Sequence, residues 1–512
     1  MNVADIMYMN ARKYPAKEAI VFKDRRYNYK EIDELSNQFA NTLIELGLTK
    51  GDRVAMMLKN SEFFPIVYFG IIKAGAVVVP VNFSLLKNEV QFILNNCEAK
   101  AFVTGEEFLT VLKGISQQLL TVEHLICIGE HTPSETLNYY EITKKQSKEA
   151  PYTKIDEEDL CEILYTSGTT GTPRGAVFKH KNVLWTIIHT GCLSHRIDLH
   201  SRTLNMMPLF HSAPLHLYFL GTIYMGGTNV ILDVFDPRVF LETIEKEKTT
   251  LFFGPAVVYL TCAKSFDLSK YDFSTMEMFV LGGSPISAED INLVLDSFSL
   301  RGKNKLQQVY GFTEGGPTGM PLRPDEIETK PASIGKAGLT STELRIADSK
   351  GNTVPAGVVG EIVVRSDSVM VEYYKDPEKT AASFFDDWFR TGDLAWYDED
   401  GYIYFADRSK DMIISGGQNV YSKEIEDILM QHPAVMMVAV IGVPDPDWGE
   451  SVKGVVSLKA GCSSSEDELI EFCKTRLAKF KCPRIIQIVN EIPHNPAGKI
   501  VKPEVRKLYG HE

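Results

Sequence analysis

The sequence contains none of the common patterns for a metal or dithiol centre. Its eight cysteines form no C-x-x-C pair, and its eleven histidines form no H-E-x-x-H motif. These absences exclude a zinc ribbon, a dithiol redox motif and a zincin-type metal site. Idle thiols in a reducing compartment are the simplest interpretation of the cysteines.

A basic surface and a long apolar run are also lacking. The net charge is −13 over 512 residues, which argues against nucleic-acid binding, because neutralising phosphates needs a basic face. The first fifteen residues, MNVADIMYMNARKYP, do not resemble a signal peptide. The most apolar stretch, residues 64–80, is interrupted by Lys73 and by glycines. The sequence therefore predicts a cytoplasmic protein with no integral membrane segment and no nucleic-acid partner. Peripheral membrane association stays open.

The first two-thirds of the chain alternates between short apolar runs and helical patterns. This alternation predicts parallel sheets covered by helices. The first series has expected strands at 54–58, 76–80 and 101–104, with expected helices at 63–73 and 88–96. The second series has expected strands at 204–207, 229–232, 250–253, 278–281 and 306–309, with expected helices at 238–246 and 288–297.

The pattern changes after about residue 340, where short β runs dominate at 343–346, 361–364 and 402–405. Farther on, strands at 435–443, 451–458 and 485–489 mix with helices at 422–431 and 466–479. We therefore expect an α/β protein: a large N-terminal region (1–407) of layered α/β subdomains with a β-rich subdomain, then a small α+β C-terminal domain (411–512). The boundary falls in the charged segment 407–411.

The most informative segment is the loop YTSGTTGTPRG at residues 165–175. It lies between two apolar runs, 163–165 and 176–178, which we expect to be strands. Its glycines allow the backbone to approach a ligand closely, while its hydroxyl groups and Arg174 provide donors for an anion. The loop is neither a Walker A motif nor a dinucleotide fingerprint. A flexible linker is the alternative, but the flanking strands and Arg174 favour a polyphosphate site.

This loop resembles the phosphate-binding signature of the adenylate-forming superfamily, which includes acyl-CoA synthetases, luciferases and the adenylation domains of peptide synthetases. The family generally has lysine where this chain has Arg174, so the charge is retained although the two groups differ in geometry. The resemblance implies that the loop contacts the β- and γ-phosphates of ATP through Thr166, Ser167, Gly168, Thr169, Thr170, Gly171 and Arg174.

Two further segments resemble the family's adenine and metal sites. In YGFTE (310–314), the resemblance implies that Tyr310 and Gly311 lie against adenine, that Thr313 meets the α-phosphate and that Glu314 holds Mg²⁺. A carboxylate is also a suitable ligand for such a hard cation. The segment LGGSPI resembles the adenine-side loop and contributes Gly283, Ser284 and Pro285. Its last residue, Ile286, replaces the glycine of a nucleophile elbow, so a serine hydrolase is not supported.

Segments near the expected domain boundary resemble the ribose site and the hinge. The resemblance implies that Asp393 of FRTGD accepts the ribose hydroxyls and that Arg408 contacts ribose or phosphate. It places Lys410 at the hinge, residues 408–410, about which a mobile C-terminal domain turns. Gly417 would then lie in the pantetheine tunnel, where a side chain would block the thiol.

Two segments concern the reacting acid. Lys499 in PHNPAGK is similar to the family lysine that bridges the carboxylate and the α-phosphate during adenylation. A cation there would offset charge on the transferring group. His211 in PLFHSAP resembles a residue of the acyl-pocket motif that lies near the carboxylate or the CoA thiol. A structural role is the alternative for a lone histidine.

The sequence indicates the acid substrate less directly than it indicates the nucleotide site. Residues 208–225 contain no Asp or Glu, whereas amino-acid-activating relatives place an Asp here to pair with the substrate ammonium. A fatty acid is expected, with an aryl or cinnamate-like acid as the alternative. Coenzyme A is the expected acceptor, because no carrier domain follows Lys499. A separate carrier protein and a homodimer both stay open.

The expected enzyme is thus an ATP-dependent carboxylic acid–CoA ligase that forms an acyl-adenylate and releases AMP and pyrophosphate. Its expected cofactors are ATP, Mg²⁺ and coenzyme A. The expected catalytic residues are Lys499, Thr313, Glu314 and His211. A regulatory nucleotide-binding module with a degenerate site is the alternative outside enzymes, and the joint presence of Glu314, Asp393, Arg408 and Lys499 argues against it.

Overall fold

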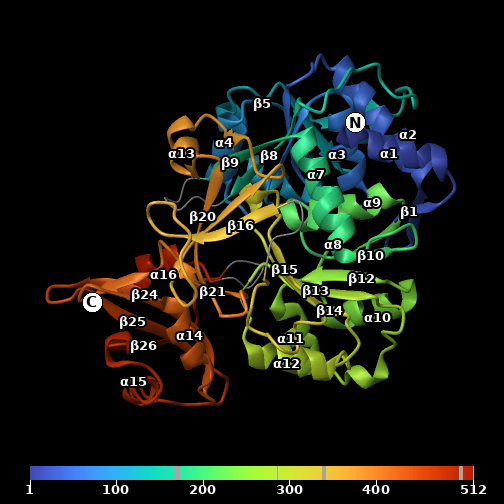
Figure 1. The fold of residues 1–512 in the computed structure, drawn as a ribbon. Helices are drawn as coiled ribbons and strands as arrows, with labels where there is room; N and C mark the ends of the chain where they lie inside the picture. The colour runs from blue at the N-terminus through green and yellow to red at the C-terminus, as the bar shows by residue number, and fades with distance from the viewer. Residues whose placement is uncertain (167–172, 285, 337–341, 495–499, 511–512) are drawn as a thin grey trace.

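The computed structural model describes residues 1–166, 173–284, 286–336, 342–494 and 500–510 (Figure 1). Its strands form four sheets. Two of them, each with eight strands, combine parallel pairs with antiparallel strands at their edges. The expected α/β class is therefore confirmed.

Sheet A runs in the order β15-β14-β13-β12-β10-β11-β1-β2. Its strands are β15 (Met320–Leu322), β14 (Leu306–Tyr310), β13 (Met278–Gly282), β12 (Leu251–Gly254), β10 (Arg202–Asn205), β11 (Thr228–Ile231), β1 (Glu18–Phe22) and β2 (Arg25–Asn28). All five strands predicted between 204 and 309 are present, with shifts of one or two residues at their ends.

Sheet B runs in the order β18-β9-β8-β4-β3-β5-β6-β7. Its strands are β18 (Glu372–Tyr373), β9 (Arg174–Lys179), β8 (Leu160–Thr166), β4 (Val77–Pro80), β3 (Arg53–Met57), β5 (Ala99–Gly105), β6 (His124–Ile128) and β7 (Leu137–Asn138). The strands predicted at 54–58, 76–80 and 101–104 are confirmed as β3, β4 and β5.

Helices pack on both large sheets because their apolar stripes need burial. One core joins sheets A and B through α1 (Val3–Lys13), α2 (Tyr29–Glu45), α3 (Phe63–Lys73), α7 (His180–Trp185) and α9 (Gly221–Met225). A second core lies between sheet A and α10 (Pro237–Glu247), α11 (Ala256–Ser265) and α12 (Ala288–Ser297). On sheet B, α4 (Lys87–Asn96) and α5 (Leu109–Leu112) cover a further core.

Several short elements connect these layers: α6 (Tyr139–Thr143), α8 (Leu193–His195) and α13 (Pro377–Ala382). Two segments, Thr186–Cys192 and Ala213–Leu220, adopt the wider π-helical winding. Such segments are rare and often lie at functional sites. Among the described residues, no helix combines the length and the apolar character needed to cross a bilayer.

The smaller sheets confirm the change of pattern after residue 340. Sheet C contains β16 (Thr342–Ala347), β17 (Gly360–Ser366), β20 (Trp388–Tyr397), β19 (Phe384–Phe385) and β21 (Ile403–Arg408). Sheet D contains β23 (Gln418–Val420), β22 (Ile413–Ser415), β25 (Gly449–Leu458), β24 (Val435–Asp445) and β26 (Ile485–Val489).

Sheet D has a hydrophobic core of its own. The helices α14 (Ser422–Met430) and α15 (Glu466–Lys474) contribute to that core, and α16 (Lys502–Tyr509) packs in a separate cluster. Figure 1 shows these orange and red elements grouped to one side of the larger blue-to-yellow part. The helix predicted at 466–479 ends at Lys474, where the chain turns before a short 3-10 segment at Lys479–Lys481.

Candidate active site

The segment at 310–314 leaves the carboxyl end of β14, and Glu314 lies in a short helical turn. One carboxylate oxygen of Glu314, Oε1, accepts hydrogen bonds from Thr166 Oγ1 at 3.1 Å and from Tyr373 Oη at 3.0 Å. Burial, and then the Glu314 carboxylate, raise the pKa of the Tyr373 phenol far above its ordinary value, so it remains a donor. The structure thus brings together Thr166 and Glu314, which lie 148 residues apart in the sequence.

The phosphate-loop segment is held at its two ends by neighbouring strands. Thr166 ends β8 and pairs directly with Arg174, which begins the antiparallel strand β9. The Arg174 guanidinium also lies 3.6 Å from the Asp376 carboxylate. Of the residues predicted for this loop, Ser167, Gly168, Thr169, Thr170 and Gly171 lie outside the described residues, as does Lys499. Thr166 and Arg174 therefore define where the loop begins and ends.

A second carboxylate, Asp393, lies on β20 opposite Arg408 of β21. Tyr310 Oη donates a hydrogen bond to Asp393 Oδ2 at 2.7 Å, and Arg408 Nε lies 3.4 Å from Asp393 Oδ1. Burial and the adjacent Asp393 raise the pKa of the Tyr310 phenol well above its ordinary range. Three residues predicted for the nucleotide site are therefore in direct contact.

The adenine-side loop follows β13, which is parallel to β14 and adjacent to it. Gly283 has a φ of +84° and is exposed, a backbone conformation that favours glycine. At Gly311 a Cβ atom would lie 2.4 Å from the Pro317 carbonyl oxygen, so a side chain cannot be accommodated without movement. The structure places Gly283 and Ser284 beside the segment that begins at Tyr310. Pro285 lies outside the described residues.

The segment expected to meet the acid reaches the same edge. Ser212, which follows His211, donates its Oγ to Thr313 Oγ1 at 3.3 Å. The His211 side chain is exposed and lies against the Phe210 ring, with ring centroids 4.3 Å apart. This contact joins the 208–214 segment to the Thr313–Glu314 turn.

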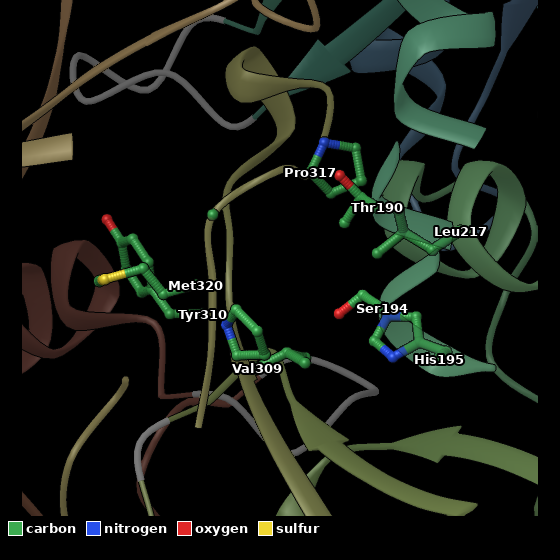
Figure 2. A pocket seen from close by; sticks show the side chains of 10 residues that line it. Thr190, Ser194, His195, Leu217, Val309, Tyr310, Pro317 and Met320 are labelled. Carbon is green, nitrogen blue, oxygen red and sulfur yellow. The ribbon is translucent and has the colours of Figure 1, made fainter. Parts of the chain in front are cut away.

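A pocket lies on the other side of β14 from the Tyr310–Asp393 contact. Figure 2 shows that Tyr310 and Met320 extend to one side of their strands, while the side chains of Thr190, Ser194 and Leu217 gather on the other side. The full lining is Thr190, Ser194, His195, Leu217, Val309, Tyr310, Pro317, Gly319, Met320 and Pro321. Thr190 and Leu217 come from the two π-helical segments and Ser194 and His195 follow the first of them, while the other six residues lie between Val309 and Pro321.

His195 in this pocket is neutral and fully paired. Burial lowers its pKa to about 4. Its Nδ1 lies 2.7 Å from Gln307 Oε1, which can only accept, so Nδ1 carries the proton. Nε2 then accepts a hydrogen bond from Tyr218 Oη at 3.2 Å. The His195 ring is therefore held in one orientation as part of the wall.

Lys410 and Gly417 lie in the segments that follow β21. Desolvation and the neighbouring Arg408 lower the pKa of the Lys410 ammonium. Gly417 has a φ of +75° and is exposed, with nothing within 4 Å of the place where a Cβ would lie. Lys410 lies between β21 of sheet C and β22 of sheet D, and Gly417 lies in the turn between β22 and β23.

Among the described residues, no group of three or more His, Cys, Asp or Glu side chains could hold a metal ion. A single carboxylate is nevertheless compatible with Mg²⁺, which commonly binds one or two carboxylates together with substrate phosphates. Glu314, with the Thr166 hydroxyl beside it, fits that requirement.

The comparisons with known proteins agree with this arrangement. The family model of the AMP-binding enzymes matches residues 7–374, and the model of their C-terminal domain matches residues 424–499. The chain belongs to the AMP-binding enzyme family. Within this family it is an adenylate-forming acyl-CoA synthetase, that is, an acid–thiol ligase, as the sequence predicts.

The relatives of this chain are named for different acid substrates. A feruloyl-CoA synthase of Amycolatopsis sp is 36% identical, over 98% of this chain and 97% of that one. A long-chain-fatty-acid–CoA ligase of Mycobacterium tuberculosis is 33% identical, over 99% of this chain and 98% of that one. A crystal structure of an anthranilate CoA ligase in complex with anthranoyl-AMP has a TM-score of 0.90 at 29% identity, covering 99% of this chain and 97% of that one.

Several features of the site were not predicted. Tyr373 belongs to no motif and reaches Glu314 only because β18 pairs with β9. Ser194 and His195 lie in an ordinary polar stretch of sequence. Nothing in their local spacing indicates that they line a pocket.

Proposed function

We propose that the protein is an ATP-dependent carboxylic acid–CoA ligase that works through an acyl-adenylate and releases AMP and pyrophosphate. The observation that carries this proposal is the meeting of Thr166, Thr313 and Glu314 beside the Tyr310–Asp393–Arg408 cluster. Hydroxyl, carboxylate and guanidinium groups of these types are the partners that Mg²⁺·ATP requires.

In this proposal the nucleotide lies along the carboxyl edge of β13 and β14. Asp393 accepts the two ribose hydroxyls, with Tyr310 and Arg408 fixing its orientation. Gly283, Ser284 and Gly311 provide a surface for the adenine ring. The loop from Thr166 to Arg174 contacts the β- and γ-phosphates. Glu314 would hold Mg²⁺, which offsets the charge of the phosphates when bound.

The first step is an in-line displacement at the α-phosphorus. A carboxylate oxygen of the acid forms a bond to this phosphorus as the bond to pyrophosphate breaks, and pyrophosphate departs with the electron pair. We assign to Thr313 a contact with the α-phosphate and to Lys499 the stabilisation of charge on the transferring group. His211 lies on the segment that Ser212 ties to Thr313, which supports a role for His211 near the acid.

The second step transfers the acyl group to sulfur. The thiolate of coenzyme A attacks the carbonyl carbon of the mixed anhydride, and AMP departs as the leaving group. We propose that residues 1–407 form one body and residues 411–512 a second, which turns about the hinge 408–410 between the steps. This motion withdraws Lys499 and brings Gly417 to the passage for the thiol.

The pocket beside β14 bears on the choice of acid. The sequence favours a fatty acid, and Leu217, Val309 and Pro317 would pack against an apolar body. The Ser194 hydroxyl, however, faces the pocket and forms no hydrogen bond to any described residue (Figure 2). A methylene chain offers this half-buried hydroxyl no hydrogen-bond partner. This supports the aryl alternative, in the form of an aryl acid that carries a hydroxyl or amino substituent.

A pyrophosphate-release screen with CoA tests the proposal. The panel contains hexanoate, decanoate and palmitate, together with cinnamate and 4-hydroxycinnamate. We expect acid-dependent release, with 4-hydroxycinnamate preferred over cinnamate and with that preference reduced in S194A. A preference for palmitate that S194A leaves unchanged would favour the fatty acid.

The same screen distinguishes coenzyme A from a carrier protein as the acceptor of the acyl group. Release of AMP and a thioester product should require coenzyme A. If pyrophosphate forms with CoA but a thioester appears only with a carrier protein, the enzyme is a carrier-loading ligase. If no acid supports pyrophosphate exchange, the ligase proposal fails and the regulatory alternative gains support.

A further inference from the structure

Helix α14 receives its N-terminal cap from another part of the molecule. Its own N-cap residue, Tyr421, forms no capping hydrogen bond through its side chain. Instead, Asp407 Oδ2 accepts hydrogen bonds from the Ser422 backbone N–H at 2.5 Å and from Ser422 Oγ at 2.7 Å. The first N–H groups of a helix lack intrahelical partners, and its positive end favours a carboxylate. Asp407 meets both needs and is only 3% exposed.

This contact crosses the boundary between sheets C and D. Asp407 lies on β21 and pairs with Leu394 of β20, whereas α14 packs on sheet D. Among the described residues, the side-chain hydrogen bonds that directly join residues up to 407 with residues beyond 411 are those between Asp407 and Ser422. Arg506 reaches only Lys410 and Asp411, which belong to the connecting segment.

The contact continues toward the segment that contains Lys499. Ser422 Oγ also accepts a hydrogen bond from Lys502 Nζ at 2.5 Å, and Lys502 forms an ion pair with Glu426 at 2.8 Å. Lys502 begins α16, directly after a bridge between His494 and Ile500. Because that bridge joins the two ends of segment 495–499, the chain Asp407–Ser422–Lys502 connects β21 to the base of this segment.

The Asp407–Ser422–Lys502 contacts bear on the first step. Lys502 lies three residues beyond Lys499, to which the proposed function assigns a role in adenylation, and Ser422 Oγ contacts both Asp407 and Lys502.

We propose that Asp407 is a positioning residue for adenylation: it fixes the C-terminal domain through the α14 N-terminus and is released before the acyl group moves to the thiol. This inference rests on the proposed two-step function and on the turn about Lys410. Asp407 itself touches neither substrate nor nucleotide in this scheme. It acts through Ser422 and Lys502 on the segment that carries the lysine.

The test compares the two half-reactions in D407A, D407N and the control variant D427N. Asp427 lies on the same helix and pairs with Lys423, one turn away on α14, so its change leaves the domain contact intact. In D407A we expect acid-dependent ATP–pyrophosphate exchange to fall about fivefold, the typical effect of losing a helix cap. Thioester formation from supplied acyl-adenylate should be unchanged or faster. D407N retains an acceptor oxygen and should recover part of the exchange rate, while D427N should match the wild type.

Equal losses in both half-reactions, or no loss in D407A, would overturn the assignment. A fluorescence distance measurement then separates this inference from the proposed function. One label goes on Cys462, the exposed thiol among the described cysteines, and the other on a cysteine introduced at exposed Glu399.

The wild-type distance should change when acyl-adenylate and CoA are added, and D407A should show part of that change without ligands. If the wild type shows no change, the proposed domain turn fails, and this inference fails with it. If the distance changes in the wild type, and D407A without ligands shows the same distance as the unliganded wild type, only the role of Asp407 is refuted.

Discussion

The hydrogen bond from Tyr310 to Asp393 allows the nucleotide assignment to be tested by removing one atom. In Y310F the ring expected to lie against adenine remains, and only the phenol oxygen is lost. Asp393 is 7% exposed, so water does not readily replace the missing donor. The Arg408 contact at 3.4 Å persists and keeps the carboxylate partly oriented.

The size of the effect follows from the type of bond. A hydrogen bond to a charged group contributes about 1.5–3 kcal/mol. Because Arg408 remains, the lower end applies, which corresponds to a roughly tenfold weaker interaction with the ribose. The phenol does not contact the reacting phosphorus in the proposed arrangement. We therefore expect the KM for ATP to rise about tenfold, while kcat changes little.

The assay is steady-state pyrophosphate release at saturating acid and CoA, with ATP varied. Burial and Asp393 raise the Tyr310 pKa, so the donor is present throughout the neutral pH range and the effect of Y310F should not vary with pH there. Y404F is the matched control, because Tyr404 Oη donates to Asp398 at 3.3 Å in the same sheet without contacting Asp393. A fall in kcat at unchanged KM, or an equal effect in Y404F, would refute the role of this bond.

Three further predictions concern catalysis and stability. K499A should lose adenylation strongly yet still form thioester from supplied acyl-adenylate; equal loss of both steps would contradict the assigned role. G417L should retain pyrophosphate release and lose CoA transfer, whereas G461L, at an open position with a similar φ of +78°, controls for backbone strain and should transfer normally. Burial lowers the pKa of His180 and of His195 from 6.5 to about 4. As the pH drops from 6.5 towards 4, these histidines therefore take up protons in the unfolded state before they do so in the folded state, and the free energy of unfolding should fall. At pH 5 each histidine should account for about 2 kcal/mol of that loss in urea titrations, and a pH dependence in H180Q equal to that of the wild type would contradict this account.

Local patterns were enough to predict many elements of the fold. The helices expected at 63–73 and 288–297 match α3 and α12, and α12 begins after Ser287, whose side chain caps it. Capping boxes at Asn2 and Asn28 mark the starts of α1 and α2, which were not predicted, although this signal is readable from sequence.

Other features depend on contacts between distant parts of the chain. The π-helical windings at 186–192 and 213–220 follow from the packing of these two segments against each other. The periodicity of their sequences does not distinguish them from α-helices. Tyr373 meets Glu314 through strand pairing, and Asp407 meets Ser422 across the domain boundary. Motif order could therefore point to Glu314, Asp393 and their partners Thr166, Tyr310 and Arg408, but not to Tyr373 or to the Asp407–Ser422 contact.

The central claim is that the acid attacks the α-phosphorus of ATP. Turnover with a carboxylic acid labelled with oxygen-18 in its carboxylate tests this most directly. The account predicts that the phosphate of AMP carries one labelled oxygen, because the bond formed in the first step is retained by AMP when the thiol attacks. Labelled inorganic phosphate formed together with ADP, or AMP without label, would contradict the proposed acyl-adenylate.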